Sequence, residues 1–208
     1  DKWPQTTHGL LQNQQWGLMT GTCESRLETL SFWESMFAGK RVISSFDAVA
    51  VCRPASQQRT YNAELKNQQA KNESVLLSSW LHTDQAKCKT QCLEHIQGAF
   101  ALTDLGESEQ RTQLVVPRGG ETAQSFRDRF IAAFPPDRKS KRGSDAEREE
   151  WIKHSDAERL WLLQNGQVVA PTLRAGEMLL WDSGVPHASI PGRLAPLSKT
   201  RSVRMSVF

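Results

Sequence analysis

Six short runs of strand-forming residues, separated by glycine, proline and polar stretches, constrain the fold of this chain most strongly. Apolar, β-branched and aromatic side chains in these runs favour strands. The runs are Ser74–Asp84, Glu94–Asp104, Gln113–Val116, Gln167–Val169, Glu177–Asp182 and Arg201–Val207. This punctuation favours an all-β sandwich or barrel over a parallel sheet with alternating helices.

The first part of the chain carries one helix and one further strand. Residues 1–22 are rich in Gln, Thr and Gly and are expected to be irregular. In Glu24–Ala38 the apolar side chains recur at helical spacing, and Gly39 is a suitable stop. We expect this helix to pack on a larger body. A β-rich run follows at Arg41–Val51, and the polar stretch Ala55–Glu73 is expected to be a long loop.

A helical insert is expected at about residues 121–163, where the spacing of apolar residues changes again. Ser144–Glu147 and Ser155–Glu158 both fit the capping box, in which serine and glutamate bind free amides at a helix start. The insert also holds a charged segment that includes Arg138–Arg142. A solvated surface is the favoured interpretation of that charge, and a nucleic-acid patch is the alternative.

The length of 208 residues indicates one domain. In it, residues 1–40 form a lead-in and helix, and 41–208 form a β core that contains the insert. Lys and Arg outnumber Asp and Glu by 26 to 23, a formal charge of +3, which gives no argument for nucleic acid.

The four cysteines contain no C-x-x-C pair and suggest a reducing compartment. No apolar run approaches the roughly 20 residues that cross a bilayer, so no membrane contact is expected. The sequence opens at Asp1 instead of Met, which suggests a piece of a longer chain. A cytoplasmic location is the expectation.

His82 and Asp84 are the pair that first suggests chemistry. In a strand, residues i and i+2 point to the same side, so an imidazole and a carboxylate converge on one point. Two histidines and one carboxylate on one face form a metal site that leaves other coordination positions open. A third ligand is needed, because H-x-D alone occurs by chance.

His187 is the preferred third ligand, since it ends the segment A-G-E-M-L-L-W-D-S-G-V-P-H, where a Gly-Pro loop places it at the far end of an apolar strand. A closed β-sandwich can bring this late strand beside an early one. The other candidates are His8, His95 and His154. Taken singly, each histidine is more often a hydrogen-bonded structural residue than a ligand.

Two arginines in the last strand are candidates for binding a carboxylate, because a guanidinium can donate two parallel hydrogen bonds to it. They are Arg201 and Arg204, three residues apart. Residues at this spacing in a strand face opposite ways, so at most one of them enters the pocket.

Five segments together resemble the phytanoyl-CoA dioxygenase-like family in order and approximate spacing. They are W-L-H-T-D-Q, H-I-Q-G-A-F-A-L-T-D-L, Q-L-V-V-P, L-R-A-G-E-M-L-L-W-D-S-G-V-P-H and T-R-S-V-R-M-S-V-F, between Ser74 and Phe208. The members are Fe(II)- and 2-oxoglutarate-dependent oxygenases with a double-stranded β-helix, a jelly-roll or cupin-like fold. The resemblance implies that fold here, mainly β with flanking helices.

The resemblance also implies roles for individual residues. His82, Asp84 and His187 would be the catalytic iron ligands, and Arg201 would hold the distal carboxylate of 2-oxoglutarate, with O2 as the other cosubstrate. Gln97 would either line the cosubstrate pocket or form a bond within the core. Trp80 and Trp181 lie near proposed ligands in the sequence, although tryptophans there are usually core packing.

The implied activity is hydroxylation or oxidative demethylation of an unidentified organic substrate, most simply a small molecule. Asp84 disfavours halogenation, because it fills the position that a halide would need. An oxygenase acting on a protein or nucleic acid, and a jelly-roll binding module without turnover, are the alternatives. The chain departs from the family at Pro117–Gly120 and at Gly184, and these departures affect the inference of substrate.

Overall fold

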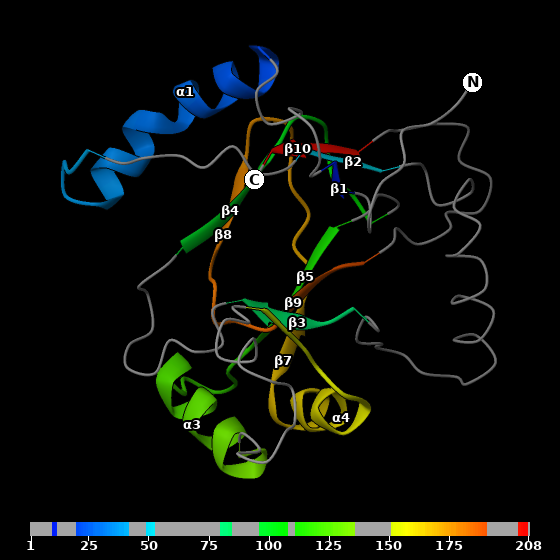
Figure 1. Cartoon of the computed structure of the whole chain (residues 1–208). Coiled ribbons are helices and arrows are strands. Elements are labelled where there is room, and N and C mark those ends of the chain that lie inside the picture. The colour runs from blue at the N-terminus through cyan, green and yellow to red at the C-terminus, as the bar shows by residue number, and fades with distance from the viewer. Residues whose placement is uncertain are drawn as a thin grey trace, which may run out of the picture.

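A computed structural model gives the fold of the chain (Figure 1). It describes residues 10–11, 20–41, 49–52, 80–84, 96–107, 111–135, 151–190 and 204–207. The elements, in chain order, are β1 (Leu10–Leu11), α1 (Thr20–Met36), β2 (Val49–Cys52), β3 (His82–Asp84), β4 (Ile96–Ala101), β5 (Arg111–Val116), α3 (Ala123–Ala133), β6 (Trp151–Lys153), α4 (Asp156–Asn165), β7 (Gln167–Val169), β8 (Met178–Asp182), β9 (His187–Ile190) and β10 (Arg204–Val207). Within these ranges, no helix combines the length and apolar character needed to cross a bilayer.

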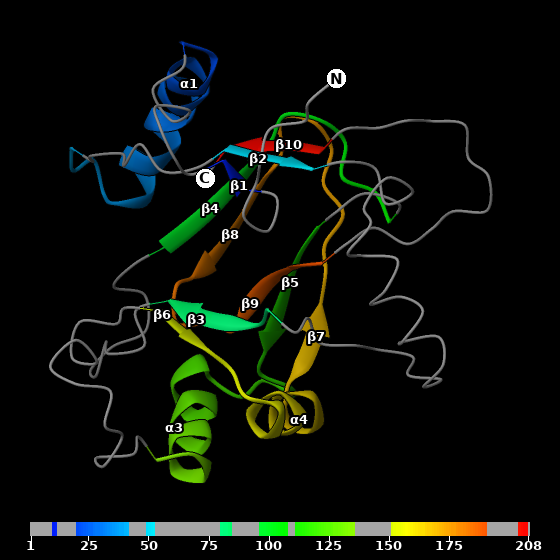
Figure 2. The same ribbon diagram turned by 45° about the vertical axis from the view of Figure 1, so that its right-hand side comes forward.

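The strands form two five-stranded sheets, seen one above the other in Figure 2. Sheet A has the order β1-β2-β10-β4-β8, and sheet B has the order β6-β3-β9-β5-β7. Every pairing between these strands is antiparallel. The predicted mainly β class with antiparallel sheets and few helices is therefore confirmed.

The strand pairings are nested along the chain. The outermost pair is β2 with β10, followed inward by β3 with β9, β4 with β8 and β5 with β7. The first and third of these pairs lie in sheet A, and the other two lie in sheet B. The nesting places segments that are far apart in the sequence on neighbouring strands.

The predicted strands are found with somewhat different bounds, and the strands β1, β6 and β9 were not predicted. The sequence placed His187 after a Gly-Pro loop at the far end of the apolar strand and predicted no further strand there, whereas His187 is the first residue of β9. Pro186 and Pro191 flank β9, so the local sequence looks like a loop. Pairing with β3 on one side and β5 on the other makes it a strand.

An inner core lies between the two sheets. Ala99 and Trp181 come from sheet A, and Leu114 comes from sheet B. Partly buried apolar residues complete this core, namely Val116, Val169, Leu179 and Val185. Burying apolar surface between two sheets is what stabilises a β-sandwich.

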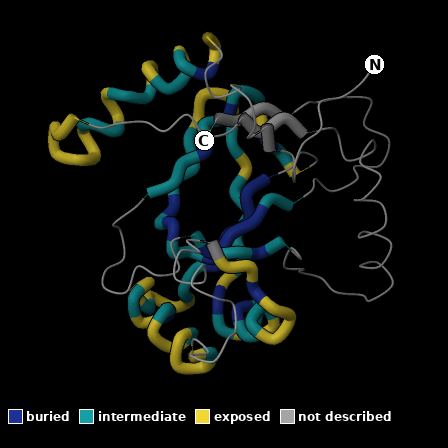
Figure 3. Tube along the Cα trace, in the orientation of Figure 1, coloured by how far each residue is buried: buried dark blue, intermediate teal, exposed yellow. Residues whose placement is uncertain are grey.

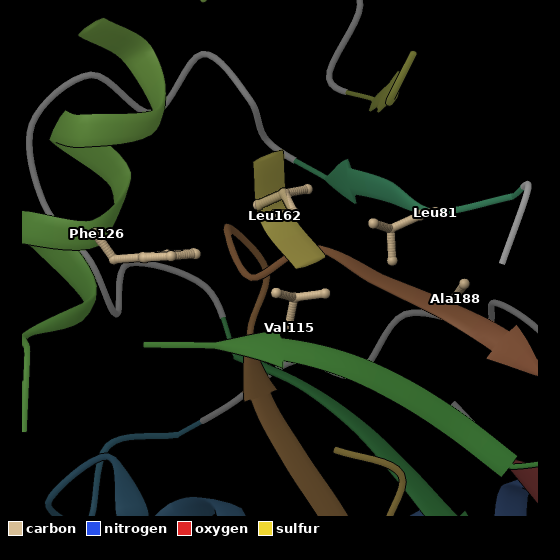
Figure 4. Packing of buried hydrophobic residues seen from close by; sticks show 5 residues of the cluster. All are labelled: Leu81, Val115, Phe126, Leu162 and Ala188. Atoms are coloured by element: carbon tan, nitrogen blue, oxygen red, sulfur yellow. The ribbon is translucent and has the colours of Figure 1, made fainter. Parts of the chain in front are cut away.

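An outer core joins the remaining face of sheet B to α3 and α4. Val115 and Ala188 of the sheet and the adjacent Leu81 meet Phe126 of α3 and Leu162 of α4 (Figure 4). All five side chains are at most 5% exposed. Sheet B is therefore covered on both faces, by sheet A on the inner face and by α3 and α4 on the outer face.

Helix α1 lies near sheet A and is only loosely covered (Figures 1 and 3). The Trp33 ring of α1 packs against Gly98 of β4. A Cβ added to Gly98 would lie only 3.0 Å from this ring. Leu27 and Phe32 are 67% and 44% exposed, so the expected packing involves only part of the apolar residues. The predicted stop is correct, since Gly39 has a φ of 74° just after the helix.

The insert was predicted to be helical, but the strand β6 separates α3 from α4, so that prediction is only partly correct. Trp151–Lys153 pairs with β3, and an edge strand of three residues between two helices carries too little pattern to be recognised. The capping box at Ser155 and Glu158 is confirmed, with both reciprocal hydrogen bonds present. The box at Ser144–Glu147, the segment Arg138–Arg142 and the loop Ala55–Glu73 lie outside the described residues.

Candidate metal centre

Strand β3 places His82 and Asp84 on one face of sheet B. The residue between them, Thr83, is buried and turns to the other face. The side chains of His82 and Asp84 are 13% and 25% exposed. The alternation expected from the sequence thus holds, and both polar side chains are partly shielded from water.

Strand β9 brings His187 directly opposite His82. The two residues are partners in the antiparallel register, so their side chains lie on the same face. Their ring centroids are 4.3 Å apart, and the His187 side chain is 8% exposed. The nested topology therefore unites the H-x-D pair with the distant histidine.

The donor atoms of these three side chains lie close enough together to hold one metal ion. One ligand atom from each of His82, Asp84 and His187 lies within 4.8 Å of the others. His82 Nε2 is 3.9 Å from Asp84 Oδ1, and His187 Nε2 is 3.5 Å from Asp84 Oδ2. Among the residues that the structure describes, no other group of three His, Cys, Asp or Glu side chains lies this close together.

Backbone carbonyls orient both imidazoles in the same way. Nδ1 of His82 lies 2.9 Å from the carbonyl oxygen of Trp80, and Nδ1 of His187 lies 2.8 Å from that of Val185. A carbonyl only accepts, so Nδ1 of each ring must carry a proton and donate it. This leaves each Nε2 facing the carboxylate, which is the second-shell arrangement usual for histidine ligands.

Asp84 is held in its charged form. Burial alone would raise its pKa, but hydrogen bonds from His187 and Gln97 and the attraction of the two imidazoles outweigh burial and lower the pKa from its usual 3.8. An ionised carboxylate is the form of Asp84 that can bind a metal ion.

The donor set fits a divalent transition-metal ion. Two imidazole nitrogens and one carboxylate oxygen are the donor set typical of non-haem Fe(II) sites. Imidazole and carboxylate also bind other divalent ions, so the chemistry of the donors indicates the class of metal. His82 and His187, which come from different strands of the same sheet, would hold the ion together with Asp84.

Gln97 and Trp181 lie beside the three donors and come from sheet A. Gln97 Nε2 donates to Asp84 Oδ2 at 2.5 Å, and Trp181 Nε1 donates to Gln97 Oε1 at 2.7 Å. The Trp181 ring lies 5.3 Å from that of His187. The sequence indicated Gln97 as a possible site residue. It did not indicate the hydrogen bond from the Trp181 indole to Gln97, because that contact depends on the pairing of two distant strands, β4 and β8.

The other histidines, arginines and tryptophans that the sequence raised as site candidates differ in how far the structure describes them. His8, His95 and Arg201 lie outside the described residues. Arg204 is the first residue of β10, where its backbone pairs with Cys52 of β2. Trp80 lies next to the site, with its ring 5.8 Å from that of His82 and the Lys153 ammonium 5.6 Å from its centre.

The two departures from the family pattern both occupy structured turns. In Pro117–Gly120, the Arg118 guanidinium donates to the carbonyl oxygens of Leu163 and Gly166 and so covers the end of α4. At the β8–β9 turn, a Cβ on Gly184 would lie 2.9 Å from Asp182 Oδ1 and 3.1 Å from Arg127 Nη1. Glycine therefore lets Arg127 of α3 approach the turn that leads to His187.

His154, another candidate ligand, lies behind the site and has a structural role. Its Nε2 is 2.8 Å from Thr83 Oγ1, and its backbone N–H donates to the Leu81 carbonyl. The ring meets Phe130 edge-on and is 4% exposed, with Nδ1 buried and without a hydrogen-bond partner. Burial lowers the pKa of His154 to about 4, against an opposing attraction from Glu158.

We predict that His154 makes the stability of the protein fall between about pH 6.5 and pH 4. Above that range the imidazole is neutral in both states and adds no pH dependence. Within it, the unfolded chain takes up a proton that the folded chain does not, so the free energy of unfolding falls by up to about 3 kcal/mol. Denaturant unfolding of the parent and His154→Gln across this range, both in chelator, measures the difference.

The His154→Gln variant should show a shallower fall in stability, because glutamine does not titrate. Other groups contribute equally to both proteins, so the difference between the two curves isolates His154. If the free energies of unfolding of the parent and the variant fell equally with pH, the His154 imidazole would take up a proton as readily in the folded protein as in the unfolded chain, and the prediction would be wrong.

Comparison with known proteins gives remote structural similarities. No protein-family model and no curated protein match the chain. It is similar to the non-heme alpha ketoglutarate dependent carbocyclase SnoK from nogalamycin biosynthesis, with 13% identity over 96% of this chain and 77% of that chain, at a TM-score of 0.33. It is also similar to the epimerase SnoN in complex with Fe3+, alpha ketoglutarate and nogalamycin RO, with 12% identity, the same coverage and a TM-score of 0.32. Similarity at this level assigns neither fold nor activity to the chain.

Proposed function

We propose that the chain is a non-haem Fe(II)- and 2-oxoglutarate-dependent dioxygenase, an oxidoreductase with one oxygenase domain. The observation that carries the proposal is the convergence of His82, Asp84 and His187, with each Nδ1 committed to a backbone carbonyl. Such a set binds one ion and leaves the opposite side of it open for a cosubstrate and oxygen. The resemblance to the phytanoyl-CoA dioxygenase-like family belongs to this proposal.

We also propose that the two sheets are the halves of a double-stranded β-helix. The nested pairs β2·β10, β3·β9, β4·β8 and β5·β7 support this, because one long antiparallel hairpin folded over on itself produces these pairs in two facing sheets. In this arrangement β1 and β6 are additions at the edges. The metal-ligating side chains then lie in the mouth of the barrel, a usual position for a ligand site.

The chain's own residues would hold and shield the reacting groups. His82, Asp84 and His187 would bind the iron, and Arg201 would bind the distal carboxylate of 2-oxoglutarate through its two-pronged guanidinium. The apolar inner core, including Leu114 and Val185, would limit the access of water. When bound, iron with 2-oxoglutarate and O2 supplies the oxidising chemistry, in which 2-oxoglutarate is converted to succinate and CO2.

The proposed substrate is a small organic molecule that is hydroxylated or oxidatively demethylated. The net charge of +3 over 208 residues offers little attraction for a nucleic acid, which favours a small molecule. An oxygenase for a protein or nucleic acid and a non-catalytic binding module are the alternatives. Oligonucleotide affinity that falls steeply with added salt would favour the nucleic-acid alternative.

The experiment that tests the proposed function is anaerobic loading with Fe(II) and 2-oxoglutarate, followed by exposure to oxygen and measurement of succinate. We expect succinate from the parent chain above the level given by His82→Ala. Binding of Fe(II) and 2-oxoglutarate without succinate would instead support a binding module. Absence of Fe(II) binding by the parent would reject the proposed function.

Arg201→Ala is predicted to weaken 2-oxoglutarate binding to the metal-loaded protein about 100-fold, while Arg204→Ala changes it little. The reason is that a charged, bidentate contact contributes roughly 3 kcal/mol. Calorimetry with Mn(II) in place of Fe(II) measures this affinity without turnover. Loss of affinity in Arg204→Ala alone would assign the cosubstrate contact to Arg204.

A further inference from the structure

We infer that Gln97 is a positioning residue for Asp84 and that Trp181 sets the orientation of its amide. This inference rests on the proposed metal site and adds two residues from sheet A to it. The three groups form a chain of hydrogen bonds from the Trp181 indole to the Gln97 amide and from that amide to the Asp84 carboxylate.

The strand register explains why the two residues act together. Gln97 of β4 and Trp181 of β8 are directly opposite each other in the antiparallel pair, so their side chains lie on the same face of sheet A. Trp181 is 7% exposed and belongs to the inner core, so this face looks toward sheet B. The amide therefore spans the space between the two sheets at the level of the metal ligands.

The chemistry of the partners determines which end of the amide faces Asp84. An indole N–H only donates, so Gln97 Oε1 must face Trp181. Once Gln97 Oε1 accepts from the indole, the amide has only its Nε2 to offer Asp84, and Nε2 donates to the carboxylate oxygen Oδ2. Each end of the glutamine has one possible partner, which removes the usual freedom of an amide to turn over.

The consequence for Asp84 is a carboxylate group whose plane is fixed. A neutral amide restrains Oδ2 without supplying a competing positive charge. Because Gln97 is partly buried, its hydrogen bond is stronger than one in water. The oxygen and one N–H of the amide are already used in this way, so positioning Asp84 explains Gln97 better than direct contact with the cosubstrate.

The inference is tested with Gln97→Met, which keeps the length of the side chain but forms no such hydrogen bond, and with Trp181→Phe, which removes the indole N–H. Trp161→Phe is the matched control, because Trp161 packs in the outer core on the opposite face of sheet B. The probe is Co(II) alone. Its affinity is measured by calorimetry, its visible spectrum reports the ligand geometry, and thermal unfolding without metal reports the fold.

We expect Gln97→Met to weaken Co(II) binding about 10- to 100-fold and to alter the spectrum, the range found for second-shell partners of metal ligands. Trp181→Phe should weaken it about fivefold, the loss expected for one neutral hydrogen bond. Trp161→Phe should leave affinity and spectrum unchanged. A Trp181→Phe protein that unfolds like the parent yet binds Co(II) more weakly supports the positioning role even if Gln97→Met is unstable.

Three outcomes would overturn the inference. Unchanged Co(II) affinity and spectrum in both variants would show that the hydrogen bonds are dispensable. A Gln97→Met protein with normal Co(II) affinity but weaker 2-oxoglutarate binding would make Gln97 a cosubstrate ligand. If the parent bound no Co(II), or bound it equally well after His82→Ala, the proposed metal site itself would fail, and the positioning role would fail with it.

Discussion

Replacement of Asp84 by alanine is expected to weaken divalent metal binding by at least about 100-fold while the protein remains folded. The loss should exceed that for a second-shell residue, which is roughly 10- to 100-fold, because Asp84 supplies the single anionic donor of the three. The fold should survive, because the substitution removes a half-buried charge together with its hydrogen bonds, and these effects partly cancel.

Unfolding experiments with and without Co(II) measure this prediction independently of any enzymatic activity. Metal at 100 times its dissociation constant should stabilise the parent by about 2.7 kcal/mol. Asp84→Ala should lose nearly all of that increment. Asp128→Ala is the matched control, since this exposed carboxylate on α3 bonds only locally, to Gln124, among the contacts observed. An Asp84→Ala protein that Co(II) stabilises as much as the parent would contradict the site.

Gly166→Ala is expected to destabilise the protein by about 3 kcal/mol. Gly166 is the C-cap of α4, and its N–H donates to the Leu162 carbonyl. An added Cβ would lie 2.5 Å from Val115 Cγ1, 2.9 Å from the Leu162 carbonyl oxygen and 3.0 Å from Phe126 Cζ. One of these neighbours is backbone and two are in the outer core, so no single side-chain rotation relieves all three contacts.

The measurement is the denaturant midpoint, compared with that of Gly21→Ala. Gly21 lies in α1, and apart from its chain neighbours and the backbone of its own helix no atom lies within 4 Å of the position of a Cβ, so alanine there should be neutral or slightly stabilising. The folded Gly166→Ala protein should retain its metal affinity, because the outer core lies on the opposite face of sheet B from the donors. A midpoint equal to that of the parent would show that α4 shifts freely against β5.

The features of the site and of the fold that follow local rules could be predicted from the sequence. Alternation along a strand places His82 and Asp84 on one face, and the structure has them in β3. The S-x-x-E pattern at Ser155 gives the start of α4 in the same way. Both features depend on residues two or three apart, so no knowledge of the rest of the chain is needed.

The parts that depend on pairing between distant strands could not be derived in this way. Strand β9 has only two apolar residues between prolines, and its neighbours β3 and β5 make it a strand. The edge strand β6 forms because β3 offers it a partner. The contact between Trp181 and Gln97 likewise depends on the register of β4 and β8, which neither local sequence specifies.

Sheet B has a seam at the proposed metal site. Its order, β6-β3-β9-β5-β7, joins a two-stranded ribbon to a three-stranded one, and the register across the junction contains a single opposed pair, His82 with His187. A metal ion held by these residues would act as a cross-link that closes a long chain loop, much as a disulfide restricts the unfolded chain. Loading the site would then fasten the two ribbons together, so the occupancy of the centre and the integrity of the sheet would be thermodynamically coupled.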